Sequence, residues 1–261
     1  MVLRMQKEPL RALLSDVGRR MGLSAGAIEL LTRSAQLSHW RKGQNIFSPE
    51  DTADFVNFLA AGAVKVSCPS GAGTVCVQLI RPGQFFGLNW YADQGQPRLF
   101  SASAFTDATV AIITNEMMAE LVANSPPPGV LRIVSFSWRV LSRLLYDKCC
   151  LLGLRMEERL VHELGVLARD FGRETEGGVL IDLPVTHADL AEFAIASRAN
   201  VARVMKRFER AELTAKDGRR LVLTARFFDQ RFNAHVKDVL RDDLLRRPHR
   251  IATTSTPAPN A

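Results

Sequence analysis

The sequence predicts an α+β fold in three parts: an N-terminal antiparallel β-roll, a long helix and a C-terminal winged helix-turn-helix. Three observations predict it. Short runs rich in Val, Ile, Phe and Thr alternate with turn residues between about 36 and 114. After a run of prolines at 126–128, apolar residues recur at helical spacing up to about 153. Two short helical stretches, each opened by an N-cap residue, follow position 183.

The roll is expected from strands separated by Gly and Pro. They are Phe55–Ala60, Ala63–Cys68, Thr74–Ile80 and Ala108–Thr114. Many short strands at this spacing are typical of an antiparallel roll or sandwich. All patterns together divide the chain into a helical arm over 1–35, the β-roll over 36–125, the long helix over 126–154, the winged helix-turn-helix over 155–248 and a disordered tail over 249–261.

The long helix carries an apolar seam with alternating spacings of four and three residues. Its members are Val134, Trp138, Leu141, Leu145 and Leu152, and Lys148 interrupts it. This spacing suits pairing with a second copy of the helix and predicts a homodimer. Packing of the helix on its own roll is the alternative. A second apolar stripe consists of Leu131, Val140, Leu144 and Leu151.

The C-terminal part contains a helix-turn-helix pattern. The pair Thr186-x-x-Asp189 stands at capping-box spacing and predicts a short helix over 187–194. A tight connection at 195–196 follows, and Ser197 caps a second helix over 198–211. Before this pattern we expect a helix over 156–169, a polar turn over 171–178 and a strand over 179–183.

Charge is distributed unevenly over this part of the chain, whose overall net charge is +7. Residues 198–231 hold ten Lys and Arg against four Asp and Glu, whereas residues 155–197 hold four against nine. A turn at 216–220, in the place of a wing, adds to the basic end. A basic helix with a capped N-terminus fits the DNA major groove, and a basic face that only meets solvent is the alternative.

Three stretches of the chain stand in a distinctive order. Phe55–Val66 reads FVNFLAAGAVKV, Arg81–Gly87 reads RPGQFFG, and Thr186–Ala191 is followed by Ser197–Val204. In this order they resemble the central roll strands, the loop entering the effector cassette and the helix-turn-helix of Crp/Fnr transcription regulators. The resemblance covers about 37 to 230. It implies a bacterial, sequence-specific DNA-binding regulator that acts as a homodimer on a palindromic site, with double-stranded DNA and RNA polymerase as partners.

Position by position, the resemblance implies that Arg198 and Arg203 read bases, since a bidentate Arg discriminates guanine. The remaining residues of the implied DNA interface are Thr186, His187, Ser197, Ala199, Asn200, Lys206 and Arg207. Two positions depart from the family. Ala199 stands where many members have a Glu that accepts from cytosine, so the half-site should differ from the common one. Ile195 stands where Gly is usual, and a β-branched residue tolerates positive φ badly.

The effector cassette departs from that of cAMP-binding relatives. Leu88 replaces their ribose-binding Glu, and Phe100 replaces the Arg that clamps the phosphate. Arg98 lies two residues away and, in regular strand alternation, shares the face of Phe100. We therefore predict no control by cAMP. The expected effector pocket consists of Phe86, Gly87, Leu88, Asn89, Arg98, Phe100, Ser101, Leu144 and Leu145. An apolar effector, a larger nucleotide held differently and a pocket filled by its own side chains all remain open.

The sequence predicts no catalytic residue, metal ligand or cofactor, because it has no nucleophile elbow, P-loop, HExxH or Cys-x-x-Cys motif. Cys68 and Cys76 can face each other across a hairpin, so a thiol switch is an alternative to ordinary buried thiols. Without a span of ~20 apolar residues or a signal peptide, we expect a cytoplasmic protein without membrane contact. The alternative function is an effector-binding module, for a cyclic dinucleotide or an apolar ligand, that regulates a protein partner.

Overall fold

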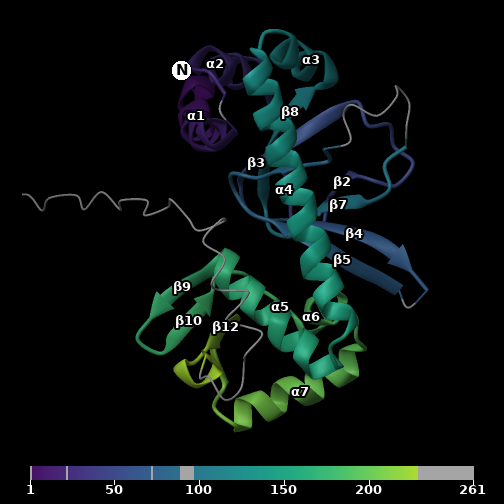
Figure 1. The fold of residues 1–261 in the computed structure, drawn as a ribbon. Coiled ribbons are helices and arrows are strands. Elements are labelled where there is room, and N and C mark those ends of the chain that lie inside the picture. Colours follow the sequence, from purple (N-terminus) through teal and green to yellow (C-terminus); the bar gives the residue numbers. More distant parts are fainter. Residues whose placement is uncertain (1, 22, 72, 89–96, 229–261) are drawn as a thin grey trace, which may run out of the picture.

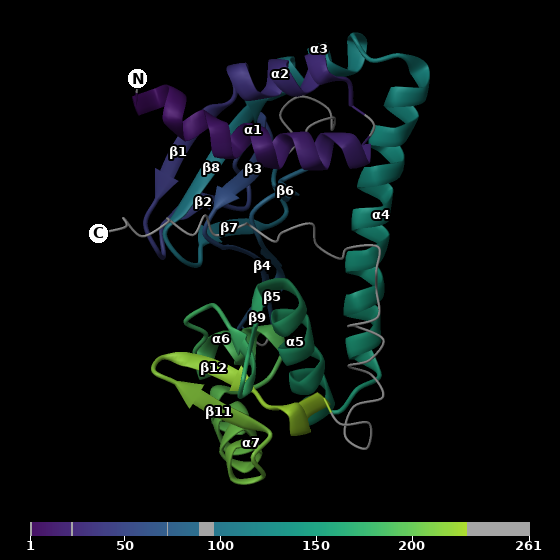
Figure 2. The ribbon, with the colours of Figure 1, turned by 90° about the vertical axis from the view of Figure 1, so that its left-hand side faces the viewer.

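The structure is a computed structural model that describes residues 2–21, 23–71, 73–88 and 97–228. It consists of a roll with two helices packed over one end, a long helix beside it and a smaller C-terminal part (Figure 1). The long helix α4 (Pro127–Leu152) runs alongside the roll and ends next to the C-terminal part, as Figure 2 shows from the side. The α+β class and the order of the parts are as the sequence predicts.

The first two helices are α1 (Val2–Met21) and α2 (Ala25–Ser34). In α1, Leu10, Leu14 and Val17 recur at helical spacing and are buried, with Leu10 fully inaccessible. They share a core with Phe58 of the roll. Helix α1 crosses over the roll and reaches α4 (Figure 2). The N-terminal arm therefore forms part of the roll's hydrophobic core.

The roll consists of two antiparallel four-stranded sheets. Their orders are β1-β8-β3-β6 and β2-β7-β4-β5. The strands are β1 (Gln36–Trp40), β2 (Asn45–Phe47), β3 (Phe55–Ala61), β4 (Val64–Ser70), β5 (Gly73–Ile80), β6 (Phe85–Phe86), β7 (Ser101–Ala104) and β8 (Ala108–Thr114). The four expected strands are β3, β4, β5 and β8, with ends that differ by at most two residues.

The turn between β3 and β4 requires glycine. Gly62 has φ of 84°, and a Cβ there would lie 2.1 Å from the carbonyl oxygen of Asp107. The neighbouring hairpin β4–β5 has a bulge, and it pairs Cys76 with Ser67 and Cys68 with Val75. The expectation that the two cysteines face each other is therefore wrong, because the bulge shifts the register by one residue.

Helix α3 (Asn115–Ala123) is capped by Thr114, whose Oγ1 accepts from the backbone N–H of Met117 at 3.4 Å. Helix α4 follows, with prolines in its first turn, where their missing N–H costs no helical hydrogen bond. Gly153 lies between α4 and α5 (Met156–Phe171). The long helix thus spans 127–152, inside the expected 126–154.

The C-terminal part has its own small antiparallel sheet, in the order β11-β12-β10-β9. Its elements after α5 are β9 (Gly172–Thr175), β10 (Gly178–Ile181), α6 (His187–Phe193), α7 (Arg198–Arg210), β11 (Thr214–Asp217), β12 (Arg220–Leu223) and the 3-10 helix η1 (Ala225–Phe228). The polar turn expected over 171–178 is wrong in part, since it contains β9. This edge strand exposes three of its four residues, so its polar composition concealed it.

The roll and the C-terminal part are in direct contact. Ala63, Cys76 and Phe105 of the roll belong to the same hydrophobic cluster as the core of the C-terminal part. The rings of Phe105 and Phe193 lie 6.2 Å apart. Three ion pairs cross the boundary around this cluster: Lys65 with Glu192 at 2.6 Å, Arg81 with Asp170 at 3.8 Å, and Lys148 of α4 with Glu163 at 3.1 Å. Helix α6 is thereby packed against β5.

Candidate nucleic-acid interface

Side-chain caps define the starts of both helices of the helix-turn-helix. The Oγ1 atom of Thr186 accepts from the backbone N–H of Asp189 at 3.2 Å, and the Asp189 carboxylate accepts from the N–H of Thr186 at 2.8 Å. In α7, Ser197 Oγ accepts from the N–H of Asn200 at 3.2 Å. Both expected caps are present, and they satisfy backbone donors that the first helical turn leaves without partners.

A shared apolar core sets the angle between the two helices. Val201, Val204 and Phe208 recur along one face of α7 and are at most 5% exposed. Around them lie Leu190, Phe193, Met205 and Leu213, all buried. The inner face of α7 is thus fully covered, and its other face is turned outward.

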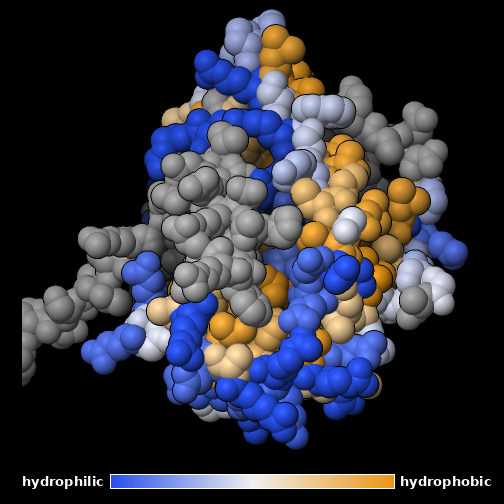
Figure 3. All heavy atoms as spheres, turned by 60° about the horizontal axis from the view of Figure 1, so that its bottom comes forward, coloured by the Kyte–Doolittle hydropathy of each residue, from blue (hydrophilic) through white to orange (hydrophobic). Residues whose placement is uncertain are grey.

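The outward face of α7 is basic. Arg198, Ala199, Arg203, Lys206 and Arg207 are exposed and Asn200 is half-buried. Arg203 donates to the Asn200 amide oxygen at 3.2 Å, and Arg207 pairs with Glu157 of α5. Figure 3, which brings this end of the molecule forward, shows hydrophilic side chains gathered over it. The expected DNA contacts Thr186 and His187 lie at the start of α6, exposed and half-buried.

The wing is the hairpin of β11 and β12. Asp217 pairs with Arg220 across its turn, and Gly218 takes φ of 58° there. Two wing cations have acidic partners: Lys216 approaches Glu209 at 4.0 Å, and Arg220 meets Asp182 at 2.8 Å. The wing is therefore less basic than its composition alone suggests.

The turn between α6 and α7 has a positive φ at Ile195, which a β-branched residue disfavours. Ile195 has φ of 51°, a left-handed value that β-branched residues rarely adopt. The turn keeps its register nonetheless, since Ala196 donates to the carbonyl of Ala191 at 2.9 Å. Ile195 thus carries backbone strain where glycine would carry none.

Replacing Ile195 with Gly is expected to raise the free energy of unfolding by about 1 kcal/mol. The substitution removes the left-handed strain, and it loses little packing because Ile195 is 38% exposed. Urea denaturation followed by circular dichroism measures the difference. The matched control is Ala196→Gly, which should destabilise because Ala196 has no positive φ. Equal loss of stability in the two variants would contradict the strain.

One arginine ties the turn to the rest of the C-terminal part. The guanidinium of Arg159 on α5 donates to three carbonyls: Ala194 at 2.8 Å, Leu154 at 2.9 Å and Ile195 at 3.0 Å. It therefore connects the turn of the helix-turn-helix with the link after α4. No sequence signal predicts this role, because Arg159 is one of several charged residues in α5 and its partners are backbone atoms.

The seam on α4 lies open to solvent in the protomer. Val134, Trp138, Leu141, Leu145 and Leu152 are 55–81% exposed. Leu131, expected in the second stripe, is 68% exposed and lies three residues before Val134, so it extends the seam. Lys148, which interrupts the seam in sequence, instead pairs with Glu163 on α5. Such a continuous exposed apolar strip is unusual for a monomeric surface.

The effector cassette is occupied by an arginine of the roll itself. Arg98 is 3% exposed, lies 4.1 Å from the centre of the Phe47 ring and donates to the carbonyl of Phe55 at 2.7 Å. A Cβ at Gly87 would lie 2.7 Å from its Nη1. Phe100 is 40% exposed, so it does not share the face of Arg98. The expected alternation is wrong because β7 begins only at Ser101.

The other expected pocket residues are dispersed. Phe86 is buried against Phe47, Leu88 packs in the core below α1, and Ser101 bonds to Ser67 with 3.0 Å between their Oγ atoms. Leu145 is exposed and Asn89 lies outside the described residues. Leu144 lines a large cavity. The six described roll residues of the expected pocket do not line this cavity.

Two further expectations concern thiols and metals. Burial raises the pKa of the Cys76 thiol to about 12, which suppresses the reactive thiolate. Among the described residues, no group of His, Cys, Asp and Glu side chains is placed to hold a metal ion. No helix in the described part of the chain has the length and apolarity needed to cross a membrane.

Two family models match the chain. The model of the cyclic nucleotide-binding domain matches residues 37–125, and that of the Crp-like helix-turn-helix domain matches residues 158–226. The first covers the strands of the roll, and the second covers α6, α7 and the wing. The order of roll and helix-turn-helix is therefore found independently by sequence comparison.

Relatives of known class cover most of the chain. The chain is 30% identical to the global nitrogen regulator of Synechococcus elongatus over 72% of its length and 85% of the relative. It is 32% identical to that of Synechocystis sp. over 77% and 84%. Among solved structures, the c-di-GMP responsive global regulator CLP of Xanthomonas campestris shares the fold, with a TM-score of 0.65 and 22% identity over 77% of this chain and all of that one. The chain belongs to the Crp/Fnr family of DNA-binding transcription regulators.

Proposed function

We propose that the protein acts as a homodimer that binds a palindromic DNA site and is not controlled by cAMP. The observation that carries the proposal is the capped, outward-facing basic surface of α7, combined with the exposed seam of α4 in the same protomer. Pairing two copies along the seam would present two α7 helices related by a twofold axis. The DNA site should then hold two half-sites about one helical turn apart.

In the proposed complex, α7 enters the major groove from its N-terminal end. Arg198 and Arg203 read base edges, and Ala199 and Asn200 lie against the bases between them. The sugar-phosphate backbone of the DNA is contacted by Thr186, His187, Ser197, Lys206 and Arg207. Of these, Arg207 must exchange its partner Glu157 for a phosphate. Because Ala199 accepts no hydrogen bond through its side chain, specificity should rest mainly on the two arginines.

The five segments expected from the sequence remain the proposed domains, and residues 249–261 lie outside the described part. We propose that the protein works in the cytoplasm with RNA polymerase as a further partner, and without catalytic activity. The absence of cAMP control is supported by Arg98, which is packed against Phe47 and Phe55 beside Gly87 rather than placed on Ser101.

The test is selection of bound duplexes from a random DNA pool by the ligand-free protein, followed by affinity measurements against salt concentration. We expect an enriched palindrome whose affinity falls steeply as salt rises, because arginines and lysines on phosphates release counterions. Repeating the selection with cAMP should leave the site and the affinity unchanged. A dependence on cAMP would contradict the last part of the proposal.

Arg203→Ala is expected to weaken binding to the selected site by about 1–3 kcal/mol and to relax the preference at one base position of each half-site. The matched control is Arg210→Ala, two turns further along the same helix and also exposed. It removes the same charge and should leave the base preference intact. If both variants keep the affinity and the preference, the alternative gains support, namely an effector-binding module that regulates a protein partner.

A further inference from the structure

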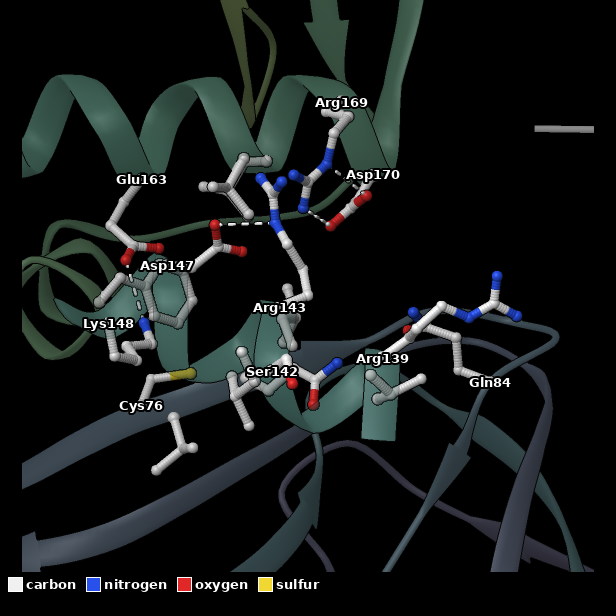
Figure 4. A pocket seen from close by; sticks show the side chains of 18 of the residues that line it. Cys76, Gln84, Arg139, Ser142, Arg143, Asp147, Lys148, Glu163, Arg169 and Asp170 are labelled. Carbon is white, nitrogen blue, oxygen red and sulfur yellow. Dashed lines mark hydrogen bonds and ion pairs between the residues drawn. The ribbon is translucent and has the colours of Figure 1, made fainter. Parts of the chain in front are cut away.

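A cavity of about 720 Å³ lies where the roll, the long helix and the C-terminal part meet. Its walls come from β5, from α4 and from α5 (Figure 4). Its volume falls within the range of small-molecule sites in proteins. The cavity is separate from the effector cassette around Gly87 and Arg98, since neither residue lines it.

Much of the cavity wall is apolar. Its apolar lining includes Leu79, Phe136, Trp138, Val140, Leu144, Val166 and Phe171. The seam residue Trp138 takes part, so the cavity opens beside the proposed dimer seam. A ligand that fills this space must bury an apolar body of considerable size.

The polar part of the wall has an excess of positive charge. Five cationic side chains line it, Arg20, Arg139, Arg143, Lys148 and Arg169, against the three acidic side chains Asp147, Glu163 and Asp170. Each acid already has a cationic partner: Arg143 lies 2.9 Å from Asp147, Lys148 3.1 Å from Glu163, and Arg169 2.9 Å from Asp170. All three acids are therefore compensated within the wall.

Two wall cations, Arg20 and Arg139, are left over after this pairing, and Arg20 pairs with Asp16 outside the wall. Arg139 forms no ion pair within the described part of the chain. The Nη1 atom of Arg169 is buried without a hydrogen-bond partner among the described residues, although the other guanidinium nitrogens bind Asp170. Figure 4 shows Arg143 and Arg169 pointing toward each other from facing helices, while Arg139 extends toward Gln84. A buried cationic donor without a partner indicates a site for an acceptor.

We propose that this cavity binds a small organic anion with an apolar, ring-sized body. The apolar wall takes the body, and the carboxylate, sulfonate or phosphate group lies among Arg139, Arg143 and Arg169. Guanidinium groups suit this task because their donors match the oxygens of such anions. The consequence for regulation rests on the proposed function: a ligand that touches β5, α4 and α5 together would fix the C-terminal part relative to the roll.

The first test uses two dyes of the same ring system with the full-length protein. The anionic dye is 8-anilinonaphthalene-1-sulfonate, and N-phenyl-1-naphthylamine is its counterpart without the sulfonate. We expect the anionic dye to bind once per protomer and about tenfold more tightly than the neutral one, measured by fluorescence titration. Equal affinities, or no saturable binding of the anionic dye, would overturn the proposal.

Two substitutions on one face of α4 locate the charge. Arg139 lines the cavity, whereas Arg132, seven residues earlier and also exposed, does not. Arg139→Glu should abolish the preference for the anionic dye, and Arg132→Glu should preserve it. Val166→Trp places a large ring in the cavity and should prevent binding of both dyes, with circular dichroism as the check of folding. If Arg132→Glu has the same effect as Arg139→Glu, the dye binds elsewhere and the proposal fails.

The DNA-linked consequence is measured separately. Saturating anionic dye should change the affinity for the selected palindrome in the wild type and leave it unchanged in Arg139→Glu. If no palindrome is ever selected, the proposed DNA function fails while the dye titrations still decide the cavity. If the dye binds as expected and the DNA affinity does not change, the cavity is a binding site and its regulatory role is overturned.

Discussion

Replacing both Leu141 and Leu145 with Glu is expected to convert the proposed homodimer into a monomer and to lower the affinity for the selected palindrome by about a hundred- to ten-thousandfold. Both side chains lie on the open seam, 55% and 60% exposed in the protomer. In a paired seam each Glu would meet the like charge of its copy with apolar residues around it. A monomer contacts one half-site only. It therefore loses the gain in affinity that a linked second α7 would provide at the other half-site.

Sedimentation equilibrium measures the assembly, since one protomer has a mass of 28.9 kDa. DNA binding is measured in parallel on the palindrome and on a single half-site. The affinity for the half-site should be nearly the same in the variant and the wild-type protein, because α7 is untouched. Arg132→Glu introduces a Glu on the same helix at a position outside the seam spacing and should remain dimeric. A dimeric double variant would show that the two copies pair through another surface.

Arg159→Met is expected to lower the free energy of unfolding by about 3 kcal/mol. Methionine preserves the aliphatic bulk and removes three donors, which leaves the carbonyls of Leu154, Ala194 and Ile195 without their charged partner. Hydrogen bonds from a charged donor contribute more than neutral ones, and their loss at the partly buried carbonyls of Leu154 and Ala194 adds a desolvation cost. Urea denaturation with far-ultraviolet circular dichroism measures the change.

Two controls separate geometry from charge. Arg159→Lys retains the charge but has a single nitrogen, so it should recover only a small part of the stability. Arg155→Met removes an exposed arginine just before the same helix and should change the stability by no more than about 0.5 kcal/mol. Full stability of Arg159→Lys would show that charge alone, and not the three-way hydrogen bonding, is what the turn requires.

Much of the fold could be predicted from the sequence because its signals are local. The capping residues Thr186 and Ser197 depend on neighbours three positions away, and the seam of α4 is a simple spacing pattern. The same holds for β8, whose ends were predicted to the residue. Strand β9 was missed because an edge strand with exposed side chains lacks the apolar alternation that reveals a strand.

The features that escaped prediction depend on distant parts of the chain. Two of the three carbonyls that Arg159 binds lie more than thirty residues away, and backbone atoms leave no trace in side-chain patterns. The sequence places Arg98 two residues from Phe100, where cAMP-binding relatives have their phosphate-clamping Arg, whereas the fold packs Arg98 between Phe47 and Phe55. The cavity between β5, α4 and α5 forms only when these three elements pack together. Its excess of positive charge therefore could not be predicted from any single segment.

The contacts that hold the C-terminal part against the roll also define an energy scale. A partly exposed ion pair stabilises the docked arrangement by about 1 kcal/mol or less. The ring contact of Phe105 with Phe193 contributes about as much again. The ion pairs and this ring contact together therefore oppose separation of the two parts by only a few kcal/mol. A molecule with a hundredfold preference for one orientation supplies about 2.7 kcal/mol, enough to reverse such a balance. The population of the docked orientation should accordingly respond to single charge changes at Lys65 or Glu192, neither of which belongs to the seam or to the proposed DNA contacts.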